Sequence, residues 1–169
     1  IIKNLRAFSK QETVQQVRVD VGAVIASVLE LTQTRRTAMG VTLRYDPPEN
    51  AVWVRGGEVR LAQVFVNLVS NALDAMESSD DRQLKITIDQ SSKIAVSIED
   101  TGPGITAPEQ VFDPFYSTKD VGAAKGVGLG LSISYAIVQS IGGEIRAHNA
   151  ASGACFAVIL WPMEQDRAA

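Results

Sequence analysis

The chain has 169 residues, of which 46% are hydrophobic and 21% charged, and its net charge is -3. This composition supports a packed core and excludes a globally disordered chain. The sequence has no basic block, which argues against nucleic acid as the main partner. Its single cysteine, Cys155, excludes an internal disulfide.

The N-terminal end carries an amphipathic pattern. Ile1, Leu5 and Phe8 recur at helical spacing with cations between them, which predicts the end of a longer helix over residues 1–11. A polar linker is predicted over 12–19. The sequence shows no apolar run long enough to span a bilayer and no signal peptide, so we expect any membrane segment to lie upstream.

Three helices and six strands are predicted after the linker. Asp20 is the expected N-cap of a helix over 21–39, and further helical patterns cover 58–77 and 129–141. Alternating apolar residues predict strands over 41–45, 51–54, 84–88, 93–99, 144–149 and 154–161, with Cys155 as a buried structural thiol. The order of these elements predicts an α+β fold, a two-layer α/β sandwich with three helices on one face of a mixed sheet.

One face of the helix predicted over 58–77 is polar. Gln63, Asn67, Asn71 and Asp74 fall at i, i+4, i+8 and i+11, opposite the apolar stripe. Asparagine is a poor helix former, and its amide oxygen can ligate Mg²⁺ while its NH₂ group meets a phosphate oxygen. Taken alone, this face is equally well explained as a solvated surface.

Two glycine-rich turns flank a segment that has little periodicity. The first, over 100–104, follows a strand pattern, and the second, over 126–131, opens a helix. Glycines let a ligand contact bare backbone, and a helix N-terminus offers free N–H groups to phosphate. The spacing matches neither a P-loop nor a Rossmann turn. We therefore predict a nucleotide site with a lid, disordered around 120–125 when the site is empty.

Four motifs resemble, in order, those of the sensor histidine kinases. Residues 63–75 resemble the N box, 100–104 the G1 box, 112–115 the F box and 126–131 the G2 box. The resemblance implies the Bergerat ATP-binding fold, which these kinases share with gyrase, Hsp90 and MutL-type ATPases. It places an ATP-binding catalytic domain over 20–163 and a tail over 164–169. Residues 5–8 and 115–119 are most similar to the nitrogen-regulation and C4-dicarboxylate sensor branch.

At the adenine end, the resemblance implies that Asp100 accepts a hydrogen bond from the exocyclic amine of the base. Guanine has no donor at that position, so this carboxylate would select adenine. Gly102 and Gly104 would let the base and sugar approach the backbone.

At the phosphate end, the resemblance implies that Asn71 ligates Mg²⁺ and that Asn67 contacts phosphate or the metal shell. Lys119 of the lid would meet the phosphates as a point charge, so Asn67 and Lys119 are the predicted catalytic residues. Asp74 is predicted to contact the cofactor or to pair with a nearby donor. The remaining predicted cofactor contacts are Gly126, Gly128, Gly130 and Leu131, and the predicted lid anchors are Phe112 and Phe115.

The related ATPases carry a Glu where Asn67 stands, and that Glu polarises the attacking water. An amide is a poor general base, so the site should pass the γ-phosphate of Mg-ATP to another nucleophile. In this family the nucleophile is a His on a dimeric helical hairpin. The only histidine here, His148, is predicted to lie on a surface strand.

The resemblance thus implies the catalytic domain of a two-component sensor histidine kinase, with the acceptor His outside this chain. The implied partners are its own hairpin, a response-regulator receiver domain and a second copy in a homodimer, in the cytoplasmic part of a membrane-anchored sensor. A Ser/Thr kinase of the same fold is one alternative, which the N-terminal helical pattern disfavours. A non-catalytic ATP-sensing module is another, which the intact Asn71, Asp100 and G2 glycines disfavour.

Overall fold

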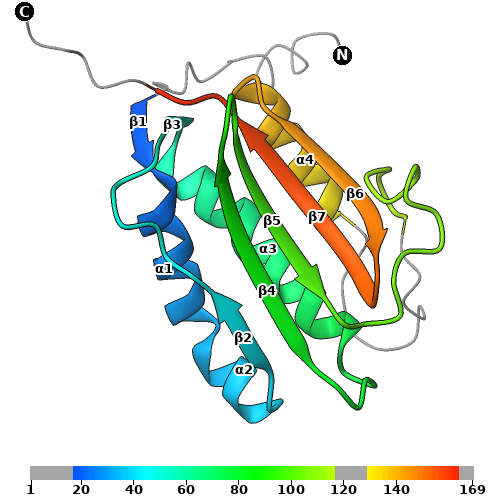
Figure 1. The fold of residues 1–169 in the computed structure, drawn as a ribbon. Coiled ribbons are helices and arrows are strands. Elements are labelled where there is room, and N and C mark those ends of the chain that lie inside the picture. The colour runs from blue at the N-terminus through cyan, green and yellow to red at the C-terminus, as the bar shows by residue number, and fades with distance from the viewer. Residues whose placement is uncertain (1–16, 117–128, 164–169) are drawn as a thin grey trace, which may run out of the picture.

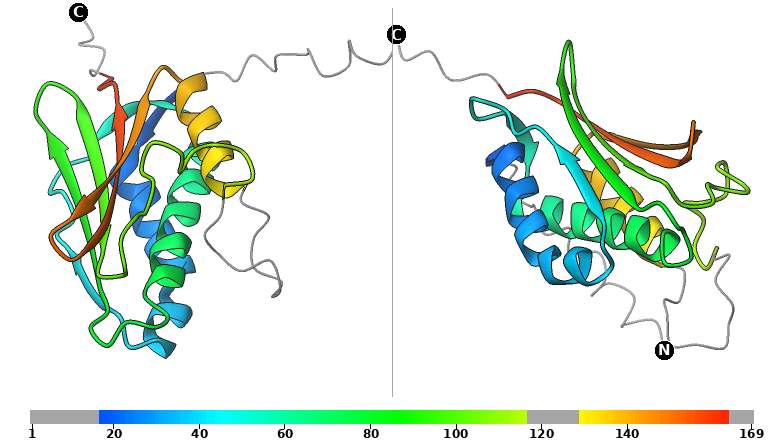
Figure 2. Two further views of the ribbon diagram at one scale, coloured as in Figure 1. Left: turned by 90° about the vertical axis from the view of Figure 1, so that its right-hand side faces the viewer. Right: turned by 60° about the horizontal axis from the view of Figure 1, so that its bottom comes forward.

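The computed structural model describes residues 17–116 and 129–163, which form a five-stranded sheet with helices packed on one face (Figure 1; Figure 2, left). In spatial order the strands are β2 (Thr42–Tyr45), β4 (Gln83–Gln90), β5 (Ile94–Asp100), β7 (Gly153–Leu160) and β6 (Glu144–Ala150). The helices are α1 (Val21–Leu31), α2 (Gln33–Ala38), α3 (Glu58–Ala75) and α4 (Gly130–Ser140). The predicted two-layer α+β fold is confirmed.

The sheet is mixed, as predicted. β2 runs parallel to β4, whereas the pairs β4–β5, β5–β7 and β6–β7 are antiparallel. β4 and β5 form the predicted hairpin, in which Leu84 lies opposite Asp100. Because β7 inserts between β5 and β6, the turn that joins β6 to β7 lies beside the end of β5 (Figure 1).

A second, two-stranded sheet lies where the described chain begins. β1 (Val17–Asp20) pairs antiparallel with β3 (Trp53–Gly56), and Val19 is buried opposite Val54. These residues overlap the segment predicted as a linker over 12–19. The alternation of Val17 and Val19 with polar residues covers only four positions, and the strand pairs with a partner more than thirty residues away.

The single helix predicted over 21–39 is divided at Thr32. Asp20 caps α1 as expected, since its side chain accepts a hydrogen bond from the Gly22 N–H at 3.0 Å. The Thr32 hydroxyl donates back to the Val28 carbonyl at 2.9 Å, and α2 begins one residue later. A threonine hydroxyl that bonds to the carbonyl of the preceding turn disfavours a regular helix interior. The apolar periodicity of the sequence gives no sign of this break.

α3 is the central helix of the second layer, in contact with α1, α4 and β5. Its apolar face is fully buried at Leu61, Phe65, Leu68 and Leu73. Such a face stabilises the fold chiefly through removal of apolar area from water. None of the described helices is both long and apolar enough to cross a lipid bilayer.

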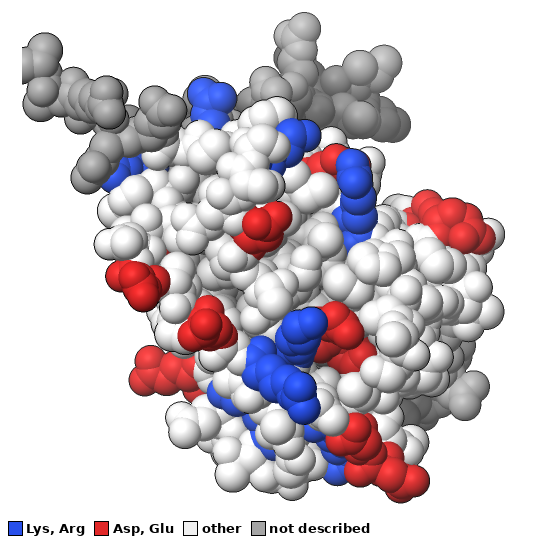
Figure 3. Space-filling view, in the orientation of Figure 1, with Lys and Arg blue, Asp and Glu red and all other residues white. Residues whose placement is uncertain are grey.

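The other face of the sheet is open to solvent. Lys85 lies 3.7 Å from Glu99 on this face, and Arg146 lies 2.7 Å from Glu144. Figure 3 shows positive and negative side chains interspersed there rather than gathered by sign. His148 is exposed on β6, as predicted, and Cys155 is buried on β7, where burial raises the pKa of its thiol.

Asp20 also links the start of α1 to the residue before β3, because its Oδ1 accepts hydrogen bonds from both Gly22 and Val52, each at 3.0 Å. We expect Asp20→Ala to lower the free energy of unfolding by about 1–2 kcal/mol, since it removes the helix cap and an acceptor for Val52. Urea denaturation measures this change. Glu30→Ala, an exposed carboxylate on α1, is the control and should change stability by less than about 0.5 kcal/mol. Equal effects of the two variants would contradict the assignment.

Candidate functional site

β5 ends in a buried carboxylate. Alternation along the strand turns Ile94, Val96 and Ile98 toward the helices, and Asp100 continues the same alternation. Asp100 is only 3% exposed. A carboxylate at such a position needs hydrogen bonds to replace the water that it loses.

Two backbone N–H groups hold one oxygen of this carboxylate. Asp100 Oδ1 accepts hydrogen bonds from Gly102 at 2.8 Å and from Ala154 at 3.4 Å. Burial raises the pKa of the Asp100 carboxyl group, and these two N–H groups act in the opposite direction. Because both bonds fall on Oδ1, Oδ2 keeps capacity to accept a hydrogen bond from a ligand amine.

Two glycines beside Asp100 have no room for a side chain. A Cβ at Gly102 would lie 2.9 Å from the Ala75 Cβ, and a Cβ at Gly153 would overlap the carbonyl oxygen of Asp100. Gly102 therefore lets the turn after β5 approach the C-terminal end of α3. Gly153, at φ 150°, lets the β6–β7 turn approach β5. Of the predicted residues, Asp100 and Gly102 are thus in contact, and Gly104 follows at the same turn.

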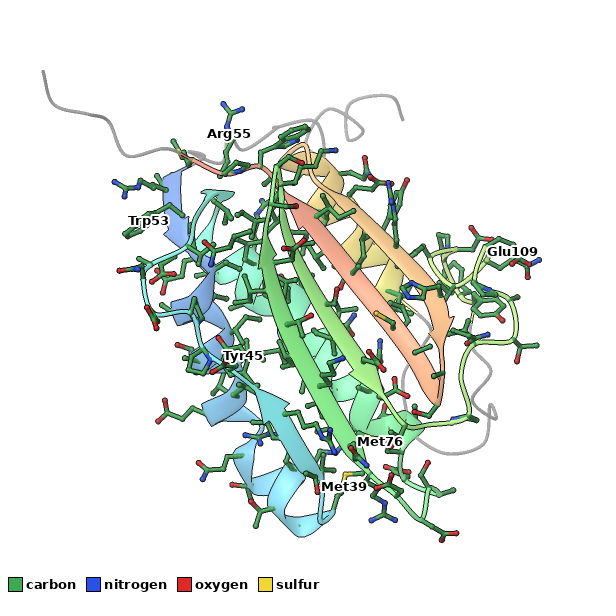
Figure 4. All side chains as sticks on the ribbon, viewed as in Figure 1. Met39, Tyr45, Trp53, Arg55, Met76 and Glu109 are labelled. Carbon is green, nitrogen blue, oxygen red and sulfur yellow. The ribbon has the colours of Figure 1, made fainter. Side chains whose placement is uncertain are left out.

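Thr101 fastens this turn to the neighbouring elements. Its hydroxyl donates to the Asp81 carbonyl at 2.7 Å and accepts from the Gln83 N–H at 2.9 Å. The sulfur of Met76, a fully buried residue just after α3, lies 3.5 Å from the same hydroxyl. Figure 4 shows Met76 at this end of the molecule. The acidic turn is therefore set against both the sheet and α3.

Asn67 and Gly130 meet where α3 packs against α4. Asn67 Nδ2 donates to Ser134 Oγ at 2.9 Å, and Ser134 is 1% exposed. A Cβ at Gly130 would clash with Asn67 Oδ1, so the glycine permits this approach. Asn67 and Ala75 are eight residues apart along α3, a rise of about 12 Å. α3 thus connects the surroundings of the buried carboxylate to this amide.

Asn71 and Asp74 lie farther along the same polar face of α3, and both are half-buried. Asp74 forms an ion pair with Arg35 of α2, and Arg35 also lies 3.3 Å from Glu77. Of the two roles predicted for Asp74, the structure shows the pairing with a nearby donor. In the described ranges, no three His, Cys, Asp or Glu side chains gather as a metal site.

The loop after β5 packs through one of the two predicted lid anchors. Phe112 contacts Tyr135 and Phe156, with ring centroids 5.6 and 6.2 Å apart respectively, so it packs against the core, while its role as a lid anchor stays a prediction. The prediction is wrong for Phe115, which is 72% exposed and has φ 66°. Glu109 in Figure 4 marks how far this loop projects beside β6.

Of the remaining predicted site residues, only Leu131 lies within the described residues. Leu131 is half-buried and packs against the hydrophobic core. Lys119, Gly126, Gly128 and the lid region 120–125 lie outside the described residues, as do the helix predicted over 1–11, the first part of the linker and the tail over 164–169.

A groove of about 460 Å³ runs between α3 and α4 beside Asn67. Its rim carries apolar side chains that remain in contact with solvent, since Val59 is 82% and Ile133 45% exposed. The other lining residues are Ala62, Gln63, Val66, Asn67, Ser70, Gly130 and Ser134.

Residues 56–165 match the family described as histidine kinase-, DNA gyrase B-, and HSP90-like ATPase. The chain belongs to this ATPase family. Within it the chain is similar to the catalytic domain of the histidine kinase ThkA, with 30% identity and a TM-score of 0.74 over 86% of this chain and 96% of that domain. The recognition of an ATP-binding histidine kinase catalytic domain is therefore confirmed.

Longer members of the family include C4-dicarboxylate transport sensors. DctB of Pseudomonas aeruginosa is 34% identical over 157 residues, which is 90% of this chain and 25% of that protein. DctB of Rhizobium meliloti is 34% identical over 163 residues, which is 95% of this chain and 26% of that protein. The chain thus spans about a quarter of these relatives. ThkA solved in complex with the response regulator TrrA matches with 27% identity and a TM-score of 0.75, over 98% of this chain and 47% of that chain.

Sequence reasoning missed three residues that shape the candidate site. Ser134, which accepts from Asn67, lies one turn after Gly130 at a position where helical periodicity calls for an apolar residue. Asn149 and Gly153 were assigned only to the end of a strand and to a turn. A buried polar residue on an apolar stripe was the available signal for Ser134, whereas the contacts of the other two depend on strand order.

Asp100→Asn tests how the buried charge of Asp100 affects the stability of the fold. The amide oxygen can still accept from Gly102 and Ala154, while the buried charge is removed. We expect the free energy of unfolding at pH 7 to stay unchanged or to rise by up to about 1 kcal/mol.

The pH dependence follows from the raised pKa of Asp100. A raised folded-state pKa stabilises the wild type fully below the ordinary carboxyl pKa of about 3.9, and this contribution is lost as pH rises through the raised value. The wild type should therefore gain stability relative to Asp100→Asn as pH falls from 7 toward 4. Urea denaturation at several pH values measures this, and a variant that is less stable than wild type by several kcal/mol at pH 7 would contradict it.

Proposed function

We propose that the chain transfers the γ-phosphate of Mg-ATP to a histidine on a helical hairpin outside it, for relay to an aspartate of a response-regulator receiver domain. The observation that supports this reaction best is the amide of Asn67. It stands at the junction of α3 and α4, where the water-activating ATPases of the superfamily carry a Glu.

The chemistry of Asn67 favours transfer to a protein nucleophile over hydrolysis. An amide cannot take a proton from water, so the site lacks the general base that hydrolysis requires. Phosphoryl transfer depends mostly on positioning and charge neutralisation. Asp100 would fix the base, and the N-terminus of α4 at Gly130 would direct free N–H groups and partial positive charge toward the phosphates.

The acceptor is placed outside the chain because His148 faces the wrong way. It is the only histidine, and it is exposed on β6, whose Ile145 is buried toward the helices. Alternation along the strand therefore directs His148 to the open face of the sheet, while Asn67 lies in the helical layer. A phosphate bound near Asn67 is separated from His148 by the sheet.

The groove between α3 and α4 is the surface that we assign to the hairpin. Its exposed Val59 and Ile133 offer apolar area next to Asn67. An amphipathic helix would bury these side chains and bring an acceptor close to the phosphates. The helical pattern of residues 1–11 fits the end of such a hairpin.

Asn71 is the residue that we assign to Mg²⁺. Magnesium prefers oxygen ligands, keeps several waters and is usually held by few protein groups together with nucleotide phosphates. A half-buried amide on α3, without a cluster of acidic side chains in the described ranges, fits a metal bound mainly through phosphate. When bound, the ion would neutralise charge that develops on the transferred phosphoryl group.

The wider assembly follows from the relatives. The ThkA complex contains a response regulator, and the DctB proteins are transport sensors about four times as long as this chain. We therefore propose that the chain is the cytoplasmic catalytic end of a membrane-anchored, homodimeric sensor that acts on a receiver domain.

The test is phosphotransfer in trans, with the hairpin of the full-length protein supplied as a separate polypeptide and γ-labelled ATP as donor. We expect acid-labile phosphohistidine on the hairpin only when the chain and Mg²⁺ are both present, and none on the chain alone. Asn71→Ala should slow labelling by at least about tenfold. Gln139→Ala, an exposed amide near the C-terminal end of α4 and outside the groove, is the control and should label at nearly the wild-type rate.

Stoichiometric phosphohistidine on the chain alone would contradict the proposal. Equal rates for the two amide variants would instead remove Asn71 from the assignment and leave the reaction intact.

A further inference from the structure

The side chain of Asn149, near the end of β6, binds the backbone of the loop that follows the acidic turn. Its Oδ1 accepts a hydrogen bond from the Ile105 N–H at 2.6 Å, and its Nδ2 donates to the Ile105 carbonyl at 2.9 Å. The side-chain amide of Asn149 thus binds both the backbone N–H and the carbonyl of Ile105, 44 positions earlier in the chain. Such paired bonds fix orientation as well as distance.

The residue before Ile105 is shaped to admit this contact. Gly104 has φ 82°, a conformation that favours glycine, and a Cβ there would lie 2.8 Å from Asn149 Oδ1. Gly104 is one of the two glycines predicted to line the base and sugar. The Asn149 contact therefore falls directly on the backbone that the nucleotide is expected to meet.

The same β6–β7 hairpin holds the other side of the turn. The Ala154 N–H donates to Asp100 Oδ1 at 3.4 Å, and Gly153 packs against the Asp100 carbonyl oxygen. Asp100 and Gly104 thus flank the acidic turn, and each is in contact with one strand end of the same hairpin. A displacement of Gly104 and Ile105 away from β6 would break the Asn149 contact.

Asn149 contributes little to the stability of the fold, because it is exposed and water can replace both of its hydrogen bonds. Its two hydrogen bonds instead fix the position of the Ile105 backbone. We propose that Asn149 is a positioning residue for adenine recognition, which fixes Gly104 and Ile105 at the distance from Asp100 that accommodates an adenine ring. This inference rests on the proposed adenine site at Asp100.

Calorimetric titration with ADP and GDP tests the proposal, with thermal unfolding as the second readout. We expect Asn149→Ala to bind ADP about tenfold more weakly and to lose part of its preference for ADP over GDP, while its unfolding temperature stays close to wild type. His148→Ala, the preceding exposed residue on β6, is the control and should bind both nucleotides like wild type.

A double-mutant cycle with Gly104→Ala distinguishes positioning from general damage. The added methyl group meets Asn149 Oδ1 in the wild-type background, but this clash is absent once the Asn149→Ala substitution has removed the amide. The strain of an alanine at φ 82° is common to both backgrounds, so the loss of ADP affinity in the double variant should be smaller than the sum of the two single losses.

Three outcomes would count against the inference. Unchanged ADP affinity in Asn149→Ala would overturn it, as would an equal loss for ADP and GDP that accompanies a lowered unfolding temperature. Failure of the wild type to bind ADP would instead overturn the adenine site on which the inference rests.

Discussion

The site depends on one constraint, the burial of an ionisable carboxylate at the inner face of a sheet. Asp100 stands where the alternation of β5 calls for an apolar side chain, and it is 3% exposed. Burial alone would favour its protonated form, which could not serve as a pure acceptor. The N–H groups of Gly102 and Ala154 counter this effect, and both can reach Oδ1 only because Gly102 and Gly153 lack side chains. The hydrogen bonds that stabilise the Asp100 carboxylate therefore depend on the close packing that these two glycines allow.

α3 connects the surroundings of the Asp100 carboxylate to the contact of Asn67 with α4. Gly102 packs on Ala75, near the C-terminal end of the helix, and about 12 Å earlier Asn67 meets Gly130 and Ser134. The buried apolar face of α3 packs in the core, and the ion pair between Asp74 and Arg35 joins α3 to α2. A nucleotide laid along it would have its base and its phosphates set by a single rigid element. Preorganisation of this kind is the main contribution that a protein makes to phosphoryl transfer.

Sequence predicted the two layers and the elements that carry the candidate site, because these depend on local pattern. The apolar stripe of α3, the alternation of β5 and the glycine turns all lie within short stretches. β1 was missed because its alternation of Val17 and Val19 with polar residues spans only four positions and its partner β3 is distant in the sequence. The break at Thr32 arises from a single hydroxyl. The contact of Asn149 with Ile105 could not be predicted, since it joins residues 44 positions apart and depends on the order of the strands in the sheet. Asp74 shows the same limit, because its ion pair depends on where α2 lies relative to α3.

Selection of the adenine ring by the Asp100 carboxylate is tested most directly by calorimetry of wild type and Asp100→Asn with non-hydrolysable ATP and GTP analogues. We expect wild type to prefer the ATP analogue and Asp100→Asn, with a donor in place of Oδ2, to lose at least about tenfold in affinity for it. The variant should at the same time remain as stable as wild type. Retention of full, adenine-selective binding by a folded Asp100→Asn protein would contradict the claim and place base recognition elsewhere in the domain.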